Sequence, residues 1–71
     1  MSGLVKRSFS LAGHRTSVAL EAEFWEALAE AAASRGVTLA RLVADLDAER
    51  DAGRPLASAL RVFALGHRNS A

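Results

Sequence analysis

The chain has 71 residues, a formal net charge of +1 and a composition that is 51% hydrophobic. A monomer of this size buries only about 60% of the surface that its unfolded chain exposes. The absence of cysteine excludes disulfides and thiolate zinc sites as further sources of stability. No apolar run approaches the roughly 18 residues that span a bilayer, and the first residues lack the apolar stretch of a secretory signal. We therefore expect one domain over 1–71, stabilised by association and cytoplasmic by default.

Positive charge is concentrated near the N-terminus. Lys6, Arg7 and Arg15, with no acid before Glu21, give the first 20 residues a charge of +3, which leaves −2 for the remainder. Domains that bind nucleic acid are often far more basic than this chain. The charge therefore indicates a basic patch on an otherwise balanced protein, and it identifies no partner by itself.

Two stretches, about 7–12 and 15–20, alternate polar and apolar residues with a period of two, which is typical of half-buried strands. A two-residue turn of type II′ at Gly13-His14 would join them as a hairpin. That turn pairs Phe9 with Val18 and places the apolar faces of the two strands together. The alternative is a break at Gly13, with the first strand pairing elsewhere.

Three amphipathic helices are predicted after the strands, over about 22–35, 38–52 and 55–66. Gly36 suits the left-handed position that ends a helix. Thr38 is a favourable N-cap for the second helix. The coarse prediction is therefore two strands followed by three helices.

The sequence gives little support for catalysis. Its two histidines, His14 and His67, lie outside any cluster of carboxylates. No nucleophile–base pair, phosphate-binding loop or metal-ligand spacing is recognisable. We therefore expect no enzymatic activity, no metal site and no cofactor.

The polar face of the second strand is a candidate binding surface, because Arg15, Ser17 and Ala19 point to the side opposite its apolar residues. Two such strands paired antiparallel form a ribbon narrow enough for the major groove of DNA. Arg15 could contact a guanine or a phosphate, Ser17 a base edge, and Ala19 a thymine methyl. A solvated sheet face with an ordinary exposed arginine explains the same pattern equally well.

The chain resembles the ribbon-helix-helix proteins of the Arc- and MetJ-like repressors over the stretch RTSVALEAEFWEALAEAAASRGVTLARLVADL. The similarity rests on the Arg-x-Ser-Val-x-Leu strand, the acidic first helical turn and the Gly-x-Thr break before a leucine-rich second helix. With KRSFSLAGH in front and the SALRVF helix behind, the pattern is similar to a group of small bacterial ribbon-helix-helix proteins that carry a C-terminal third helix.

The resemblance implies a mainly α fold with a short β ribbon, assembled as an intertwined homodimer whose paired strands enter the major groove. The implied base contacts are Arg15, Ser17 and Ala19. Phosphate contacts are implied at the N-terminus of the second helix, where backbone N–H groups are free. The phosphate candidates, including two from the basic N-terminus, are Val37, Thr38, Leu39, Lys6 and Arg7. The candidates for the dimer core are Val18, Leu20, Phe24, Trp25, Leu28, Leu42, Val43 and Leu46.

The leading interpretation is a homodimeric, DNA-binding transcriptional regulator that contacts no membrane. The alternative is a protein-interaction or antitoxin-like dimer module without operator binding, whose protein partner binds through 56–65. That helix is more apolar than a free helix tolerates, and we favour packing on the dimer core as the reason. The first strand is decisive for DNA binding. If 7–12 folds back on 15–20 as a hairpin, a dimer paired through its ribbon has a four-stranded sheet. With strands about 4.8 Å apart, such a sheet is wider than the major groove of about 12 Å.

Overall fold

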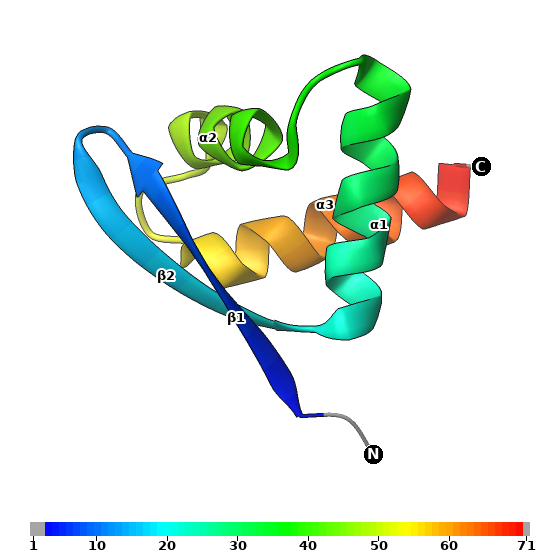
Figure 1. Cartoon of the computed structure of the whole chain (residues 1–71), viewed down its shortest axis with the longest axis horizontal. Coiled ribbons are helices and arrows are strands. Elements are labelled where there is room, and N and C mark those ends of the chain that lie inside the picture. The colour runs from blue at the N-terminus through cyan, green and yellow to red at the C-terminus, as the bar shows by residue number, and fades with distance from the viewer. Residues whose placement is uncertain (1–2, 71) are drawn as a thin grey trace.

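The computed structural model of the chain describes residues 3–70. The elements in chain order are the strands β1 (Leu4–Leu11) and β2 (His14–Glu21) and the helices α1 (Ala22–Arg35), α2 (Leu39–Glu49) and α3 (Leu56–Ser70). β1 begins earlier than residue 7, α2 ends before residue 52, and α3 continues past residue 66. Figure 1 shows the hairpin on one side of the molecule, with α1 on the opposite side and α3 crossing behind it.

The hairpin is an antiparallel sheet of two strands from the same chain. Its turn is Ala12-Gly13, and both residues have positive φ, 51° and 81°. Positive φ at both central residues is the signature of a type I′ turn, whose twist matches that of the flanking strands. Phe9 therefore pairs with Thr16. The predicted type II′ turn at Gly13-His14, and the pairing of Phe9 with Val18, are wrong.

The helix caps agree with the sequence predictions. Gly36 adopts φ 70° after α1, and its N–H donates to the carbonyls of Ala32 and Ala33. The Thr38 side chain accepts a hydrogen bond of 3.0 Å from the backbone N–H of Arg41 at the start of α2. These caps satisfy backbone groups that the ends of helices leave free, so they fix the turn between α1 and α2.

All five elements contribute to one hydrophobic core within the chain. Its largest fully buried side chains come from β2, α1, α2 and α3, and are Leu20, Leu28, Leu42, Leu60 and Val43. Of the dimer-core candidates, Phe24 and Leu46 are only partly buried, whereas the others are buried inside this single chain. The apolar face of β2 is thus covered by its own chain. The helices that pack against β2 are α1 and α3, so burial of this face does not require the association that the size of the chain led us to expect.

Candidate nucleic-acid interface

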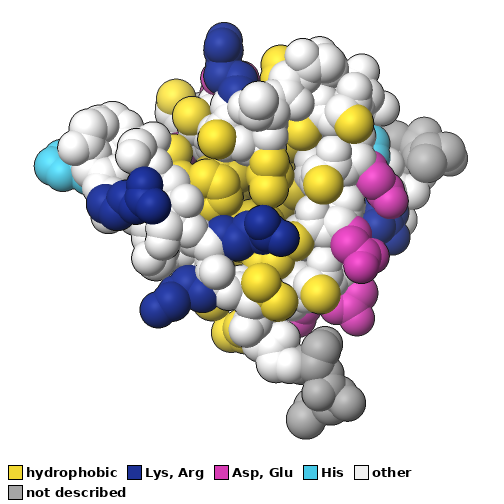
Figure 2. All heavy atoms as spheres, viewed as in Figure 1, with side chains coloured by type: hydrophobic (Ala, Val, Ile, Leu, Met, Phe, Trp, Pro, Cys, Tyr) yellow, Lys and Arg dark blue, Asp and Glu magenta, His cyan; other side chains and the backbone are white. Residues whose placement is uncertain are grey.

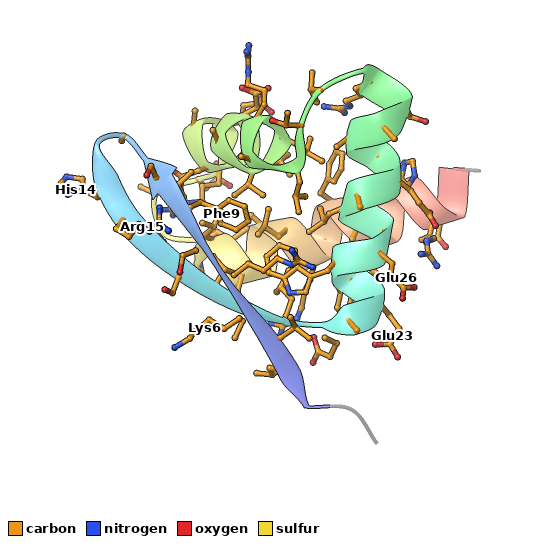
Figure 3. All side chains as sticks on the ribbon, in the orientation of Figure 1. Lys6, Phe9, His14, Arg15, Glu23 and Glu26 are labelled. Atoms are coloured by element: carbon orange, nitrogen blue, oxygen red, sulfur yellow. The ribbon has the colours of Figure 1, made fainter. Side chains whose placement is uncertain are left out.

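The outer face of the hairpin is polar and cationic. The register places Lys6 opposite Ala19, Ser8 opposite Ser17 and Ser10 opposite Arg15. The side chains of these pairs alternate with the buried Phe9, Leu11, Val18 and Leu20, and therefore point away from the helices. Figure 3 shows Lys6 pointing away from the helices, whereas Phe9 lies between the hairpin and the helical layer.

Hydrogen bonds across the strands order this face. The hydroxyl groups of Ser8 and Ser17 are 3.0 Å apart. Nη1 of Arg15 lies 3.5 Å from Oγ of Ser10, at the outer limit of a hydrogen bond. Ser8 and Ser10 were not among the predicted site residues, although their alternation with Phe9 and Leu11 placed them on the polar face. Because the pairs are exposed, their hydroxyl groups can exchange these partners for a ligand.

No acidic residue precedes Glu21. Lys6 and Arg15 form no ion pair within residues 3–70. Figure 2 shows lysine and arginine side chains over the hairpin, with acidic side chains gathered along α1 at the opposite edge. The outer face of the hairpin therefore offers an uncompensated positive charge to a polyanion.

Arg7 lies on the other face of β1 from Lys6. It shares that face with Phe9, and its guanidinium lies 5.5 Å from the centroid of the Trp25 ring. Trp25 in turn donates from Nε1 to the carbonyl of Val5 at 2.8 Å. The two N-terminal cations, which were grouped as phosphate candidates, therefore belong to separate surfaces. The sequence already indicated this separation, because side chains at 7 and 9 of a strand lie on one face and the side chain at 6 lies on the other.

The N-terminus of α2 retains part of its predicted anion-binding capacity. The N–H of Val37 donates to Ala32 at 3.0 Å, and so is already used. Thr38 caps the helix through its side chain. The N–H groups of Leu39 and Ala40 in the first turn lie too early in α2 for intrahelical partners. Leu39 lines a hollow together with Val5 and Arg7. The structure therefore places this helix end near Arg7 and does not group it with the outer face of the hairpin.

At the junction between the hairpin and α1, the fold makes one carboxyl group, that of Glu21, more acidic. The pKa of Glu21 lies below its usual value, first because of a hydrogen bond from its own backbone N–H. Desolvation opposes this effect, and the hydrogen bond and charge of Arg61 add to the lowering. Arg61 lies 3.1 Å from the carboxylate. Glu21 is therefore ionised at neutral pH and partnered by α3, which limits its repulsion of an anion at the ribbon.

Comparison with known families identifies the architecture. A family model described as ribbon-helix-helix domain matches residues 4–68. The chain belongs to this ribbon-helix-helix family. Its members are generally DNA-binding transcription regulators or antitoxins and are non-enzymatic. No curated protein and no solved structure matches the chain.

The family match covers the hairpin and all but the last residues of α3. The two-stranded antiparallel ribbon followed by three helices agrees with the ribbon-helix-helix fold. None of the helices described over residues 3–70 is both long and apolar enough to cross a membrane.

Proposed function

We propose that this ribbon-helix-helix chain is a homodimeric, DNA-binding transcriptional regulator whose β1–β2 ribbon enters the major groove. The observation that carries the proposal is the outer face of the hairpin, which has cations and hydroxyl groups along its length and a single acid, Glu21, at the end that joins α1. Two strands about 4.8 Å apart fit a groove of about 12 Å, which admits a two-stranded ribbon. One chain therefore presents a ribbon of suitable width without a strand from its partner.

Each outer residue has a role that matches its chemistry. Arg15 is the base-reading candidate, since a guanidinium can bind the O6 and N7 atoms of guanine together. Ser17 can donate to or accept from a base, and the half-buried Ala19 offers only a methyl contact. Lys6 is the phosphate candidate on the same face. Arg7 and the N-terminus of α2 could bind phosphate only on a second surface.

Salt dependence tests the proposal. Labelled duplexes from a random pool should be retained at about 50 mM salt, and binding should weaken steeply as salt rises because bound counterions are released. The substitution Arg15→Ala should weaken binding about 10-fold or more, the order expected when a bidentate base contact is lost. Arg68→Ala is the charge-matched control, because Arg68 is near the far end of α3 and pairs with Glu30.

Two results would contradict DNA binding by this ribbon. The first is failure to retain any duplex from the pool at about 50 mM salt, where electrostatic binding is strong. The second is an equal loss of affinity in the Arg15 and Arg68 variants, because the change in net charge alone would then explain the weaker binding.

A protein-binding role remains the second candidate because of one observation on α3. Val62 and Leu65 are exposed by 55% and 53%, and they lie one helical turn apart. Leu60 is completely buried, so it cannot be a direct contact of a partner that binds 56–65. Val62→Asp with Leu65→Asp should abolish capture of a protein partner and leave DNA binding unchanged. Loss of the fold in this variant would make the two residues structural.

A further inference from the structure

The side chain of Arg15 is held by a residue of the other strand. Ser10 of β1 is the direct partner of Arg15 in the register of the hairpin, and both residues are exposed. Nη1 of Arg15 donates to Oγ of Ser10 at 3.5 Å. This is the only polar contact of the Arg15 side chain within residues 3–70. The direction of the guanidinium therefore depends on a hydroxyl group that β1 supplies beside the turn (Figure 3).

The next pair along the outer face has the same arrangement. Ser8 of β1 lies opposite Ser17 of β2, and their hydroxyl oxygens are 3.0 Å apart. In each pair the β2 residue is a candidate base contact and the β1 residue is a serine. A serine hydroxyl can accept a hydrogen bond and donate another at the same time. β1 thus provides a hydroxyl group beside each of these two base-reading candidates.

The contact between Ser10 and Arg15 bears on base recognition through the freedom of the arginine side chain. An exposed arginine has many rotamers, and a bidentate contact with a guanine removes most of them. A contact that already restricts the side chain before binding lowers this entropic cost. Ser10 takes only one of the five N–H donors of the guanidinium, so the edge formed by Nε and Nη2 stays free for the O6 and N7 atoms of guanine.

The neutral character of Ser10 also suits this role. Arg41, another exposed arginine, is held by the carboxylate of Asp45 at 3.1 Å, which compensates its charge. Arg15 is instead held by an uncharged acceptor and forms no ion pair within the described residues. Ser10 therefore restricts the guanidinium and leaves its positive charge available to DNA.

We propose that Ser10 is a positioning residue for the contact of Arg15 with guanine. β1 then contributes to base specificity through a side chain that acts on Arg15 and not on the DNA. The inference rests on the proposed DNA-binding function. It extends that function to a strand that holds none of the base-contact candidates.

Exchange of single guanines tests this role in the full-length chain. In a duplex that the wild type retains from a random pool, each guanine is replaced in turn by 7-deazaguanine, which lacks the N7 acceptor. The guanine read by Arg15 is the one whose replacement weakens the wild type about tenfold and leaves Arg15→Ala unaffected. Ser10→Ala should reduce this ratio to about threefold or less, since one ordering hydrogen bond is lost. Ser10→Thr keeps the hydroxyl group and should retain the wild-type ratio.

Ser8→Ala is the matched control. It removes the same group from the neighbouring outward position of β1, where the hydroxyl contacts Ser17 and not Arg15. The ratio at the guanine read by Arg15 should therefore stay unchanged in this variant. Because Ser8 and Ser10 are both exposed, both alanine variants should unfold at nearly the wild-type urea concentration.

The order of the Arg15 side chain can also be measured without DNA. Nitrogen NMR relaxation of its Nε–H group should give a lower order parameter in Ser10→Ala than in the wild type or in Ser10→Thr. An unchanged order parameter in Ser10→Ala would overturn the proposal, because Ser10 would then not restrict Arg15.

Two results with DNA would also overturn it. One is an unchanged guanine ratio in Ser10→Ala. The other is an equal effect of Ser10→Ala in a chain that already carries Arg15→Ala, since Ser10 would then act on the DNA directly. Failure of the wild type to retain any duplex would refute the proposed function and this inference together. Binding by the wild type with the ratio unchanged in Ser10→Ala would refute the positioning role alone.

Discussion

Arg61 of α3 contacts one carboxylate oxygen of Glu21 through both Nε and Nη2, each at 3.1 Å, although the residues are 40 positions apart. Glu21 occupies the N-cap position of α1, at the end of β2. The Arg61 guanidinium also lies 5.7 Å from the centroid of the Phe24 ring. α3 therefore contacts the point at which the ribbon passes into the helical layer, and it helps to set the position of the ribbon.

The Glu21 carboxylate should make stability depend on acid pH. Its pKa is lowered in the folded chain from 4.5, so its stabilising effect is fully present above about pH 4.5 and is lost as the pH falls through the folded-state pKa. Glu21→Gln should therefore unfold at a lower urea concentration than the wild type at neutral pH, by a small margin because both side chains of the pair are partly exposed to water. The two midpoints should converge in acid. A margin that is constant with pH would contradict this.

The type I′ turn gives a stabilising substitution. Ala12 is a non-glycine residue at φ 51°, and left-handed backbone costs such a residue about 1 kcal/mol. Asn tolerates this conformation, and Asn-Gly is the preferred type I′ pair. Ala12→Asn should raise the free energy of unfolding by about 0.5–1 kcal/mol, measured by urea denaturation. Gly13→Ala should lower it, and stabilisation by that second change would refute the turn assignment.

The role of α3 in the core can be measured with two leucines. Leu60 is completely buried, whereas Leu65 is 53% exposed. Leu60→Ala should cost about 2–5 kcal/mol of stability, because it removes buried methyl groups and leaves a cavity. Leu65→Ala should change stability by less than about 0.5 kcal/mol. Equal effects of the two substitutions in chemical denaturation would show that α3 does not pack as described.

Trp25 links α1 to β1 and is the only tryptophan in the chain. Trp25→Phe keeps an aromatic ring but removes the hydrogen bond to the Val5 carbonyl, and should cost about 1–3 kcal/mol through the group left unpaired and the lost volume. Hydrogen exchange of β1 amides should accelerate more in this variant than exchange in α2. Uniform acceleration would indicate global destabilisation and not a local release of β1.

The parts of the fold that depend on local chemistry were predictable from the sequence. Gly36 and Thr38 each act within one turn of the chain, through a left-handed backbone and a side-chain acceptor respectively. The alternation along 15–20 likewise placed Arg15 and Ser17 on one exposed face. These predictions depend only on interactions between residues that are close in the sequence.

The turn of the hairpin was harder, because two registers that differ by a slide of two residues keep the same residues on the core face. The observed register differs by pairing Ser8 with Ser17 and Ser10 with Arg15. Because alanine rarely adopts positive φ, the sequence did not indicate a turn at Ala12-Gly13. The origin of the core was also hidden, since apolar periodicity shows which face is buried but not which chain covers it. The contribution of Leu60 depends on contacts across the whole sequence.

The pairing of β1 with β2 in one chain also determines the symmetry of the surface that DNA would meet. A ribbon made from two copies of one strand reads the same in both directions. Here one strand presents Lys6, Ser8 and Ser10, and the other presents Arg15, Ser17 and Ala19. The hairpin therefore has a direction, and a duplex held by a single hairpin would be read with a defined polarity, so that its recognition element need not be a palindrome.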